Sequence, residues 1–483
     1  MILDYFYKIC SIPHCSGHED GLVRYIISLA KKNRLAYKLD AVGNLLITKE
    51  AFKGYEHLPT VVLQSHLDMV CEKKPGYQHD FFKDPIKTNR DGDWIRSIGT
   101  SLGADNGIGV AIMLEIMADR QAQHGALEFL FTIEEETALR GAYNINENFF
   151  RGNLLINLDT EDDGVICIGC AGGIRSIGIG KFLFTKPPKG LGCYRITVEG
   201  LNGGHSGIDI NKGRLNAIKV LAKILNNILY EKNIFLASLQ GGDKDNAIPR
   251  QAEALILFSQ AEIGAIKKII TESSSKFQKE AIVSDPGLRI DFTEEAKRPN
   301  KVFNPESQKR LLDLLITLPS GPLAVEKIDP KLTRTSTNLA SINLSDNTLF
   351  IRMFSRSSSE NDLSDLKDNL HSIFIQSDFE VKEDCYFPAW QPDPQLLLFN
   401  VASQCYQELF REEAGVLSIH AGLECAIFKQ KIPSLDLISI GPNIENAHSP
   451  SERVSISSIE KSYKLLLTIL QGKTSPSPLS LQA

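Results

Sequence analysis

The apolar positions of the first 190 residues alternate between helical spacing and the short runs that are typical of strands. Residues 22–32 and 104–120 have helical spacing, whereas residues 59–68, 125–136 and 152–159 are apolar runs with little polar interruption. Strands of this kind, separated by helices, predict an α/β sheet that is covered on both faces. In such sheets, ligands bind beyond the carboxyl ends of the strands.

From about residue 193 the pattern changes to the order strand, helix, strand, strand, helix, strand. A looser second copy of this order follows, with helices at 305–317 and near 361–377. The order predicts an α+β region that can be read as a duplicated ferredoxin-like unit. The last part of the chain then returns to the first sheet with a helix, a strand and a final helix.

This return divides the sequence into an interrupted domain, an insert and a tail. We expect one domain to be formed by residues 1–192 and 389–472, with residues 193–388 inserted into it as a second domain. Residues 473–483 are rich in serine and proline, and we expect them to be disordered.

Composition and charge indicate a globular protein and exclude several kinds of partner. The 483 residues carry a formal net charge of −6, which argues against nucleic acid or an anionic membrane as the main partner. No apolar run approaches the roughly 20 residues of a transmembrane helix, and the first residues lack the pattern of a signal peptide. Nine scattered cysteines, with a single CxxC at Cys167 and Cys170, are typical of buried, reduced side chains. We therefore expect a cytoplasmic protein.

Acidic and histidine side chains stand at the ends of the apolar segments of the first domain, where ligands bind. They are His66, Asp68, Asp105, Glu135, Glu136, Asp159 and, far downstream, His448. Carboxylates and imidazoles without paired cysteines suit zinc, manganese or cobalt used for hydrolysis better than a structural zinc. Two divalent ions roughly 3.5–4 Å apart can hold a hydroxide at neutral pH and polarise an amide carbonyl. Asp105 has an ordinary alternative as the N-cap of the helix that follows it.

Several motifs occur in an order and spacing that resemble those of the M20 metallopeptidases. They are HLDMV at 66–70, LGADNGIGVA at 102–111, a Glu pair before Gly-Ala, LINLD at 155–159, GGHSG at 203–207 and AHSP at 447–450. The resemblance is greatest to the branch of cytosolic aminoacyl-histidine dipeptidases. It implies a zinc-exopeptidase-like catalytic domain with an inserted lid or dimerisation domain, a homodimer, and two divalent ions per chain, zinc before manganese or cobalt. The apolar face of residues 215–229 is larger than one small sheet can cover, which also favours a dimer.

The resemblance implies a role for each candidate of the first domain. The metal ligands would be His66, Asp105, Glu136, Asp159 and His448. Asp105 would bridge the two ions, and Glu135 would be the general base. Asp68, two residues after His66, would accept the imidazole N–H and fix the tautomer, although it could instead cap the segment that follows.

Three consecutive acids, Glu134–Glu136, stand where the family has a Glu pair, so it must be decided which two of them belong to the site. Counting back from Gly141 and Ala142, as in the family, selects Glu135 and Glu136 for the site. In a strand, however, Glu134 and Glu136 would share one face while Glu135 points away. The chain must therefore leave strand geometry here, and Glu134 is expected to be a solvated acid.

Further candidates lie outside the first 160 residues. His205 in GGHSG would reach into an active site, in related enzymes that of the partner subunit, and contact an oxyanion, or else be a turn histidine. Asn246 and Arg356 are candidates for substrate contacts, because an Arg fork suits a carboxylate, whereas an Arg at a strand end is usually a solvated charge. Glu424, four residues after His420 on a predicted helix, could contact the substrate amine or support the metal site.

The resemblance implies hydrolysis of dipeptides, of the Xaa-His type including beta-alanyl-histidine, by a metal-bound hydroxide with Glu135 as the general base. A second interpretation keeps the site and changes the substrate to that of an M20-type aminoacylase, deacetylase or carboxypeptidase. The long two-part insert favours the dipeptidase. A third interpretation is a metal-binding scaffold that has lost activity, against which Glu135 argues, because binding alone does not require that residue.

Overall fold

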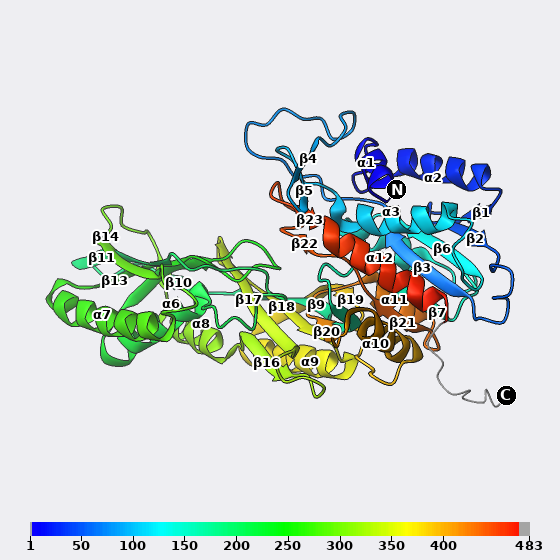
Figure 1. Ribbon diagram of the computed structural model, residues 1–483. Coiled ribbons are helices and arrows are strands. Elements are labelled where there is room, and N and C mark those ends of the chain that lie inside the picture. The colour runs from blue at the N-terminus through cyan, green and yellow to red at the C-terminus, as the bar shows by residue number, and fades with distance from the viewer. Residues whose placement is uncertain (1, 473–483) are drawn as a thin grey trace. The chain divides into compact units, whose positions relative to one another are not determined.

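The computed structural model describes residues 2–472, which form two compact units (Figure 1). The first unit comprises the chain up to Gly169, Pro392–Ser418 and the chain from Leu423 onward, and the second comprises Cys170–Gln391 with Ile419–Gly422. Each unit has its own sheet and its own apolar core. The tail that we expect to be disordered, residues 473–483, lies outside the described residues. Among the described helices, none has the length and the apolar run that crossing a membrane would require.

The first unit is built on an eight-stranded sheet in the order β1-β2-β6-β3-β7-β21-β8-β20. The strands are β1 (Ala36–Leu39), β2 (Leu45–Lys49), β3 (Val61–His66), β6 (Leu127–Thr132), β7 (Leu154–Asn157), β8 (Val165–Cys170), β20 (Gly415–Ile419) and β21 (Asp436–Ser439). The helices are α1 (Ile2–Cys10), α2 (Asp20–Lys32), α3 (Ala104–Ala118), α4 (Glu135–Ala138), α5 (Arg140–Asn144), α10 (Leu397–Phe410), α11 (Glu424–Lys431) and α12 (Ile456–Leu470). Strands β3, β6, β7 and β21 run parallel, and every residue of β3 and β6 is buried. The predicted α/β class is confirmed.

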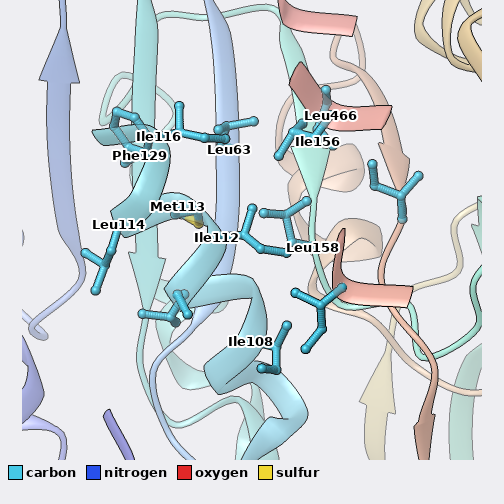
Figure 2. Close-up of a cluster of buried hydrophobic side chains, with 14 of the residues drawn as sticks. Leu63, Ile108, Ile112, Met113, Leu114, Ile116, Phe129, Ile156, Leu158 and Leu466 are labelled. Atoms are coloured by element: carbon cyan, nitrogen blue, oxygen red, sulfur yellow. The ribbon is translucent and has the colours of Figure 1, made fainter. Parts of the chain in front are cut away.

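Helix α3 is apolar on all sides, and such a helix needs cover all round. Figure 2 shows Ile112 and Ile116 of this helix among Leu63, Phe129 and Ile156, which come from β3, β6 and β7. Burial of this kind stabilises by about 1.5–3 kcal/mol for each large apolar side chain. The packing fixes α3, and with it the turn at its beginning, against the central strands.

The parallel strands bring the candidate residues to one edge of the sheet. β3, β6 and β7 end at His66, Thr132 and Asn157, and His66 stands opposite Thr132 in the register. The segments that leave these three strands carry Asp68, the pair Glu135 and Glu136, and Asp159, whereas Asp105 stands at the beginning of α3. This is the edge at which ligands bind in parallel sheets.

A small four-stranded sheet in the order β22-β23-β5-β4 holds the last candidate of this unit. Its strands are β4 (Thr88–Asp91), β5 (Trp94–Ser97), β22 (Ile444–Glu445) and β23 (Arg453–Ser455). His448 lies in the turn between β22 and β23, which pair antiparallel. The turn is anchored at both ends by hydrogen-bonded strands.

The second unit contains a nine-stranded sheet in the order β14-β11-β13-β12-β17-β18-β9-β19, with β16 beside β17. The strands are β9 (Gly172–Lys181), β11 (Leu191–Glu199), β12 (Phe235–Gly241), β13 (Ala252–Ser259), β14 (Arg289–Glu294), β16 (Gly321–Val325), β17 (Thr333–Ser345), β18 (Thr348–Ser357) and β19 (Phe379–Phe387), and β10 (Phe184–Thr185) pairs with β15 (Val302–Phe303) separately. The helices are α6 (Ala217–Glu231), α7 (Ile263–Glu280), α8 (Pro305–Thr317) and α9 (Glu360–Gln376).

Both halves of this sheet follow the β-α-β-β-α-β order. The first half is β11-α6-β12-β13-α7-β14, and the second is β9, then α8-β17-β18-α9-β19. In each half the fourth strand lies beside the first and the third lies between the first and the second. The first half is thus inserted between the first strand and the first helix of the second half.

The structure corrects the expected domain boundaries. β9 pairs with β18 and β19 and belongs to the second unit, so the division falls after Gly169 and not after residue 192. The return falls at Pro392 in place of residue 389, and Ile419–Gly422 belong to the second unit as well. The boundary was placed too late because β9, the first strand of the second half, precedes every element of the first half in the sequence.

Helix α6 is covered within its own unit, which corrects the physical reason for expecting a dimer. Its buried face includes Ile218, Leu221 and Leu225, and α7, α8 and the sheet pack against it. The apolar surface of residues 215–229 therefore does not call for a second chain.

Candidate active site

His66 and Asp68 stand at and just beyond the end of β3, and both are buried. His66 Nδ1 lies 3.4 Å from Asp68 Oδ1. Asp68 also accepts the backbone N–H groups of Glu135 at 2.9 Å and Glu136 at 3.1 Å. Asp68 thus faces His66, and the N–H groups that it accepts belong to the short helix α4 and not to the segment that follows Asp68 in the sequence.

The run of three acids leaves strand geometry at Glu134, as the sequence requires. Glu134 has φ 49° and ψ 44°, in the left-handed region, and α4 begins at the next residue. The Glu134 carboxylate forms an ion pair with Arg140, which is exposed. Glu135 and Glu136 follow on the first turn of α4, with the Glu136 side chain only 6% exposed.

Five side chains form two groups that share Asp105. In one group, His66 Nε2 lies 3.1 Å from Asp105 Oδ1 and 3.3 Å from Asp159 Oδ1. In the other, His448 Nε2 lies 2.9 Å from Asp105 Oδ2 and 3.0 Å from Glu136 Oε2. Each oxygen of Asp105 thus faces a different imidazole.

This donor set fits a pair of divalent cations. One nitrogen or oxygen from each of His66, Asp105 and Glu136 lies within 4.8 Å of the others, so donor atoms of both groups lie close together around Asp105. Glu136 Oε1 is buried and has no hydrogen-bond partner among the described residues, so an oxygen is available for a ligand. Imidazole and carboxylate donors are those preferred by zinc, manganese and cobalt.

The electrostatics of the group favour bound cations. Burial raises the pKa of Glu136 to about 7, and the neighbouring Asp105 adds to the rise. Burial also holds the pKa of Glu135 well above its usual value. Hydrogen bonds to Asp105 and Glu136 raise the pKa of His448 to about 11. Crowded, buried carboxylates repel one another, and positive charge placed between them relieves that repulsion.

Asp105 is not the N-cap of α3, which corrects the alternative that its position suggested. The N-cap position is Gly103, in the left-handed region with φ 71°, and no side chain caps the helix from there. Asp105 and Asn106 have non-helical backbone angles, and the peptide bond between them is cis. Asn106 Nδ2 donates to Asp159 Oδ1 at 2.6 Å, so the residue after Asp105 holds Asp159 in place.

Glu424 is buried against β3 and β6. Its side chain is 0% exposed, and Oε2 accepts Gln64 Nε2 at 2.6 Å and Thr132 Oγ1 at 2.7 Å. Gln64 precedes His66 by two residues on β3, so the alternative role, support of the metal site, fits the geometry. The predicted helix that would carry both His420 and Glu424 is wrong, because α11 begins at Glu424.

In the second unit, His205, Arg356 and His420 gather around Gly207. A Cβ atom at Gly207 would lie 2.1 Å from the His420 carbonyl oxygen, 3.1 Å from His205 Cε1 and 3.2 Å from Arg356 Nε. His205 Nδ1 accepts the backbone N–H groups of Gly207 and Ile208, both at 3.2 Å. The GGHSG loop therefore needs its last glycine so that these side chains can approach closely.

Arg356 is buried, which excludes the interpretation as a solvated charge. The residue is 4% exposed, its Nε has no hydrogen-bond partner among the described residues, and burial lowers its pKa to about 10. The guanidinium lies 4.7 Å from the ring centre of Phe354 and 5.7 Å from that of Phe387. Asn246 is exposed, and its carbonyl oxygen accepts the N–H of Ser206 next to His205.

His420, for which no role is predicted from the sequence, also belongs to this group around Gly207. Burial, and then the charge of Arg356, lower its pKa to about 3, and its Nε2 lies 2.7 Å from Ser336 Oγ. It is thus a neutral imidazole beside a buried guanidinium.

Most of the sequence matches one known protein family. The sequence profile of the Peptidase family M20/M25/M40 matches residues 62–472. The chain belongs to this peptidase family. This M20 chain is 36% identical over 468 residues to the cytosol non-specific dipeptidase of Escherichia coli (strain K12). The aligned residues cover 97% of this chain and 96% of the relative.

Solved structures agree with this membership. The aminoacylhistidine dipeptidase from Vibrio alginolyticus is similar over 98% of this chain and 96% of its own, with 32% identity and a TM-score of 0.89. The aminopeptidase PepT from Bacillus cereus ATCC 10987 shares the fold, with 14% identity, a TM-score of 0.57 and 97% of each chain covered. The predicted M20 resemblance is confirmed, and with it the class of enzyme, a peptidase.

A segment of this M20 chain that supports the site was missed as a functional element. Ser16 Oγ donates to Asp68 Oδ2 at 2.7 Å, and Glu19 Oε1 accepts the N–H of Glu134 at 3.0 Å. A disulfide joins Cys15 to Cys71, 56 positions apart, so the expectation that all the cysteines are reduced is wrong for this pair. The motif IPHCSGHE marks the segment, but a pairing over such a distance leaves no local pattern in a sequence.

Proposed function

We propose that this M20 protein is a dipeptidase that uses two divalent metal ions per chain. The observation that carries the proposal is the pair of imidazole–carboxylate groups that share Asp105. His66, Asp105 and Asp159 would hold one ion, and His448, Asp105 and Glu136 the other. Zinc is our first choice, with manganese or cobalt as alternatives. When bound, the ions would make water a nucleophile at neutral pH and polarise the scissile carbonyl.

Glu135 is our candidate for the general base. It would take a proton from the attacking water and pass it to the leaving nitrogen, because it stands beside the proposed ligands without pairing with either imidazole. Its backbone N–H is fixed by Asp68, which also faces His66. Asp68 would thereby orient a ligand and the base at once.

His205 and Arg356 are our candidates for contacts with the substrate in the second unit. Because His205 Nδ1 accepts two backbone N–H groups, Nε2 carries the hydrogen of the neutral ring and can donate to an oxyanion. The buried guanidinium of Arg356 suits the carboxylate of a dipeptide, and Asn246 lies beside the His205 loop. From the family resemblance we further propose a homodimer in which the second unit is a lid or dimerisation domain and His205 completes a site.

The proposed substrates are dipeptides, including the Xaa-His type such as beta-alanyl-histidine. The name of the Vibrio alginolyticus relative supports the Xaa-His type, and that of the Escherichia coli relative supports a broader range and a cytoplasmic location. We propose neither nucleic acid nor a membrane as a partner.

A substrate screen of the metal-reconstituted protein tests the proposal. We expect hydrolysis of Xaa-His and other dipeptides, loss of activity with a chelator, and recovery with Zn, Mn or Co. Faster hydrolysis of N-acyl amino acids would favour the aminoacylase or deacetylase, and release of C-terminal residues from long peptides the carboxypeptidase. Two bound ions without hydrolysis of any of these would favour the inactive scaffold.

A further inference from the structure

Glu452 is a buried carboxylate four residues after His448, just before β23. It is 2% exposed. Its oxygens accept four consecutive backbone N–H groups: those of Leu102, Gly103, Ala104 and Asp105, at 2.7, 3.1, 2.7 and 3.3 Å. One side chain from the far end of the sequence thus binds the whole turn that begins α3.

The turn needs an external acceptor. The first N–H groups of a helix have no partner within it, and α3 has no side-chain cap of its own. A carboxylate at this end is also favoured by the helix dipole. Glu452 supplies both the acceptor and the negative charge.

The same turn sets the direction of Asp105. Gly103 takes a left-handed conformation, and Asp105 leaves the helical angles, so that its two oxygens face His66 and His448. His448 and Glu452 lie in one turn, between β22 and β23. This turn therefore carries an imidazole that faces Asp105 and also the carboxylate that holds the Asp105 backbone.

We propose that Glu452 is a positioning residue of the metal centre, which locks the Leu102–Asp105 turn and thereby sets the affinity for the ions. The proposal rests on the two-ion function proposed above. A merely structural cap would change the stability of the protein without changing metal affinity, and this difference makes the role testable.

The test compares Glu452→Gln, Glu452→Asp and the control Glu445→Gln. Gln keeps the size but replaces one acceptor oxygen with a donor, and Asp keeps the charge with a shorter reach. Glu445 lies across the same turn and makes an exposed ion pair with Arg453, 2.8 Å from Arg453 Nε. The full-length proteins are stripped and titrated with Zn against a competing chelator, and their metal-free forms are melted and checked by circular dichroism.

We expect Glu452→Gln to fold and to bind Zn about ten- to a hundredfold more weakly, the usual effect of removing a group that orients a ligand. Glu452→Asp should recover part of the loss, and Glu445→Gln should match the wild type. A folded Glu452→Gln with wild-type affinity would overturn the proposal, even if its melting temperature fell. If Glu452→Gln does not fold, wild-type affinity in Glu452→Asp overturns it. A wild-type protein that binds no divalent ion would overturn the proposed function itself.

Discussion

The two units hold buried charge of opposite sign. In the first unit, Asp105, Asp159 and Glu136 crowd around two imidazoles, and burial and repulsion raise the pKa of Glu136. In the second unit, the buried Arg356 lies beside the neutral His420. Burying either kind of charge is costly unless a partner of opposite charge binds it. A cation would relieve the repulsion in the first group, and an anion would offset the buried charge of the second; for the proposed dipeptide substrates, that anion would be the terminal carboxylate.

The largest effect should come from the proposed base of the first unit. Glu135→Gln should lower kcat by about 10²- to 10⁴-fold with normal metal content, because it removes a proton acceptor and leaves the proposed ligands in place. Glu136→Gln should lose metal as well, as elemental analysis would show. Glu134→Gln is the control, since Glu134 pairs with Arg140, and should leave both unchanged. If Glu135→Gln lost metal and Glu136→Gln kept it, the assignment of base and ligand to these two residues would be wrong by one position.

A smaller effect should separate the anion site from the cation site. Arg356→Met should lower kcat/KM for dipeptides by about 10- to 100-fold without loss of metal, because a hydrogen bond to a charged group contributes about 1.5–3 kcal/mol. C-terminally amidated dipeptides lack the carboxylate and should be affected little. Arg352→Gln, on the same strand but 42% exposed, is the matched control. If Arg356→Met lowered kcat/KM equally for free and amidated dipeptides, Arg356 would not bind the substrate carboxylate.

The disulfide should stabilise the first unit only. Cys71→Ser should lower the free energy of unfolding by about 2–4 kcal/mol, because the cross-link restricts the unfolded chain. Denaturant titration measures the loss, and Cys385→Ser, at an exposed free cysteine of the second unit, is the control. A Cys71→Ser protein as stable as the wild type would show that the cross-link adds nothing.

The smallest effect concerns pH and the second unit. Burial lowers the pKa of His420 to about 3, so below pH 6.5 the unfolded chain binds a proton that the folded protein does not. The free energy of unfolding should therefore fall as the pH drops from about 6.5 toward 3, by about 1 kcal/mol at pH 5.5. His420→Gln should remove this part of the pH dependence in parallel denaturation curves. Identical pH profiles for the two proteins would contradict the assignment.

The sequence sufficed wherever local rules decide the outcome. Buried apolar runs predicted the parallel strands that end at His66 and Asn157, and the adjacency of Glu135 and Glu136 required the backbone to leave strand geometry at Glu134. Contacts between segments that are distant in the sequence could not be predicted from its pattern. The pairing of β9 with β18, the cover over α6 and the Cys15–Cys71 bond depend on which segments meet, and no periodicity records that.

Glu452 shows the same limit at a single residue. In the sequence it is one acid among many, whereas in the fold it binds a turn about 350 positions earlier. For Glu424 the sequence suggested a relation that the fold does not contain. Its spacing from His420 predicted that both lie on one helix, but α11 begins at Glu424 and does not include His420.

Anomalous diffraction from crystals grown with Zn or Mn tests the central claim most directly. We predict two metal peaks per chain, one beside His66 and Asp159 and one beside His448 and Glu136, with Asp105 between them. Asp105→Ala should weaken both peaks. A single peak at full occupancy with excess metal, or two peaks that Asp105 does not contact, would contradict the shared-ligand site.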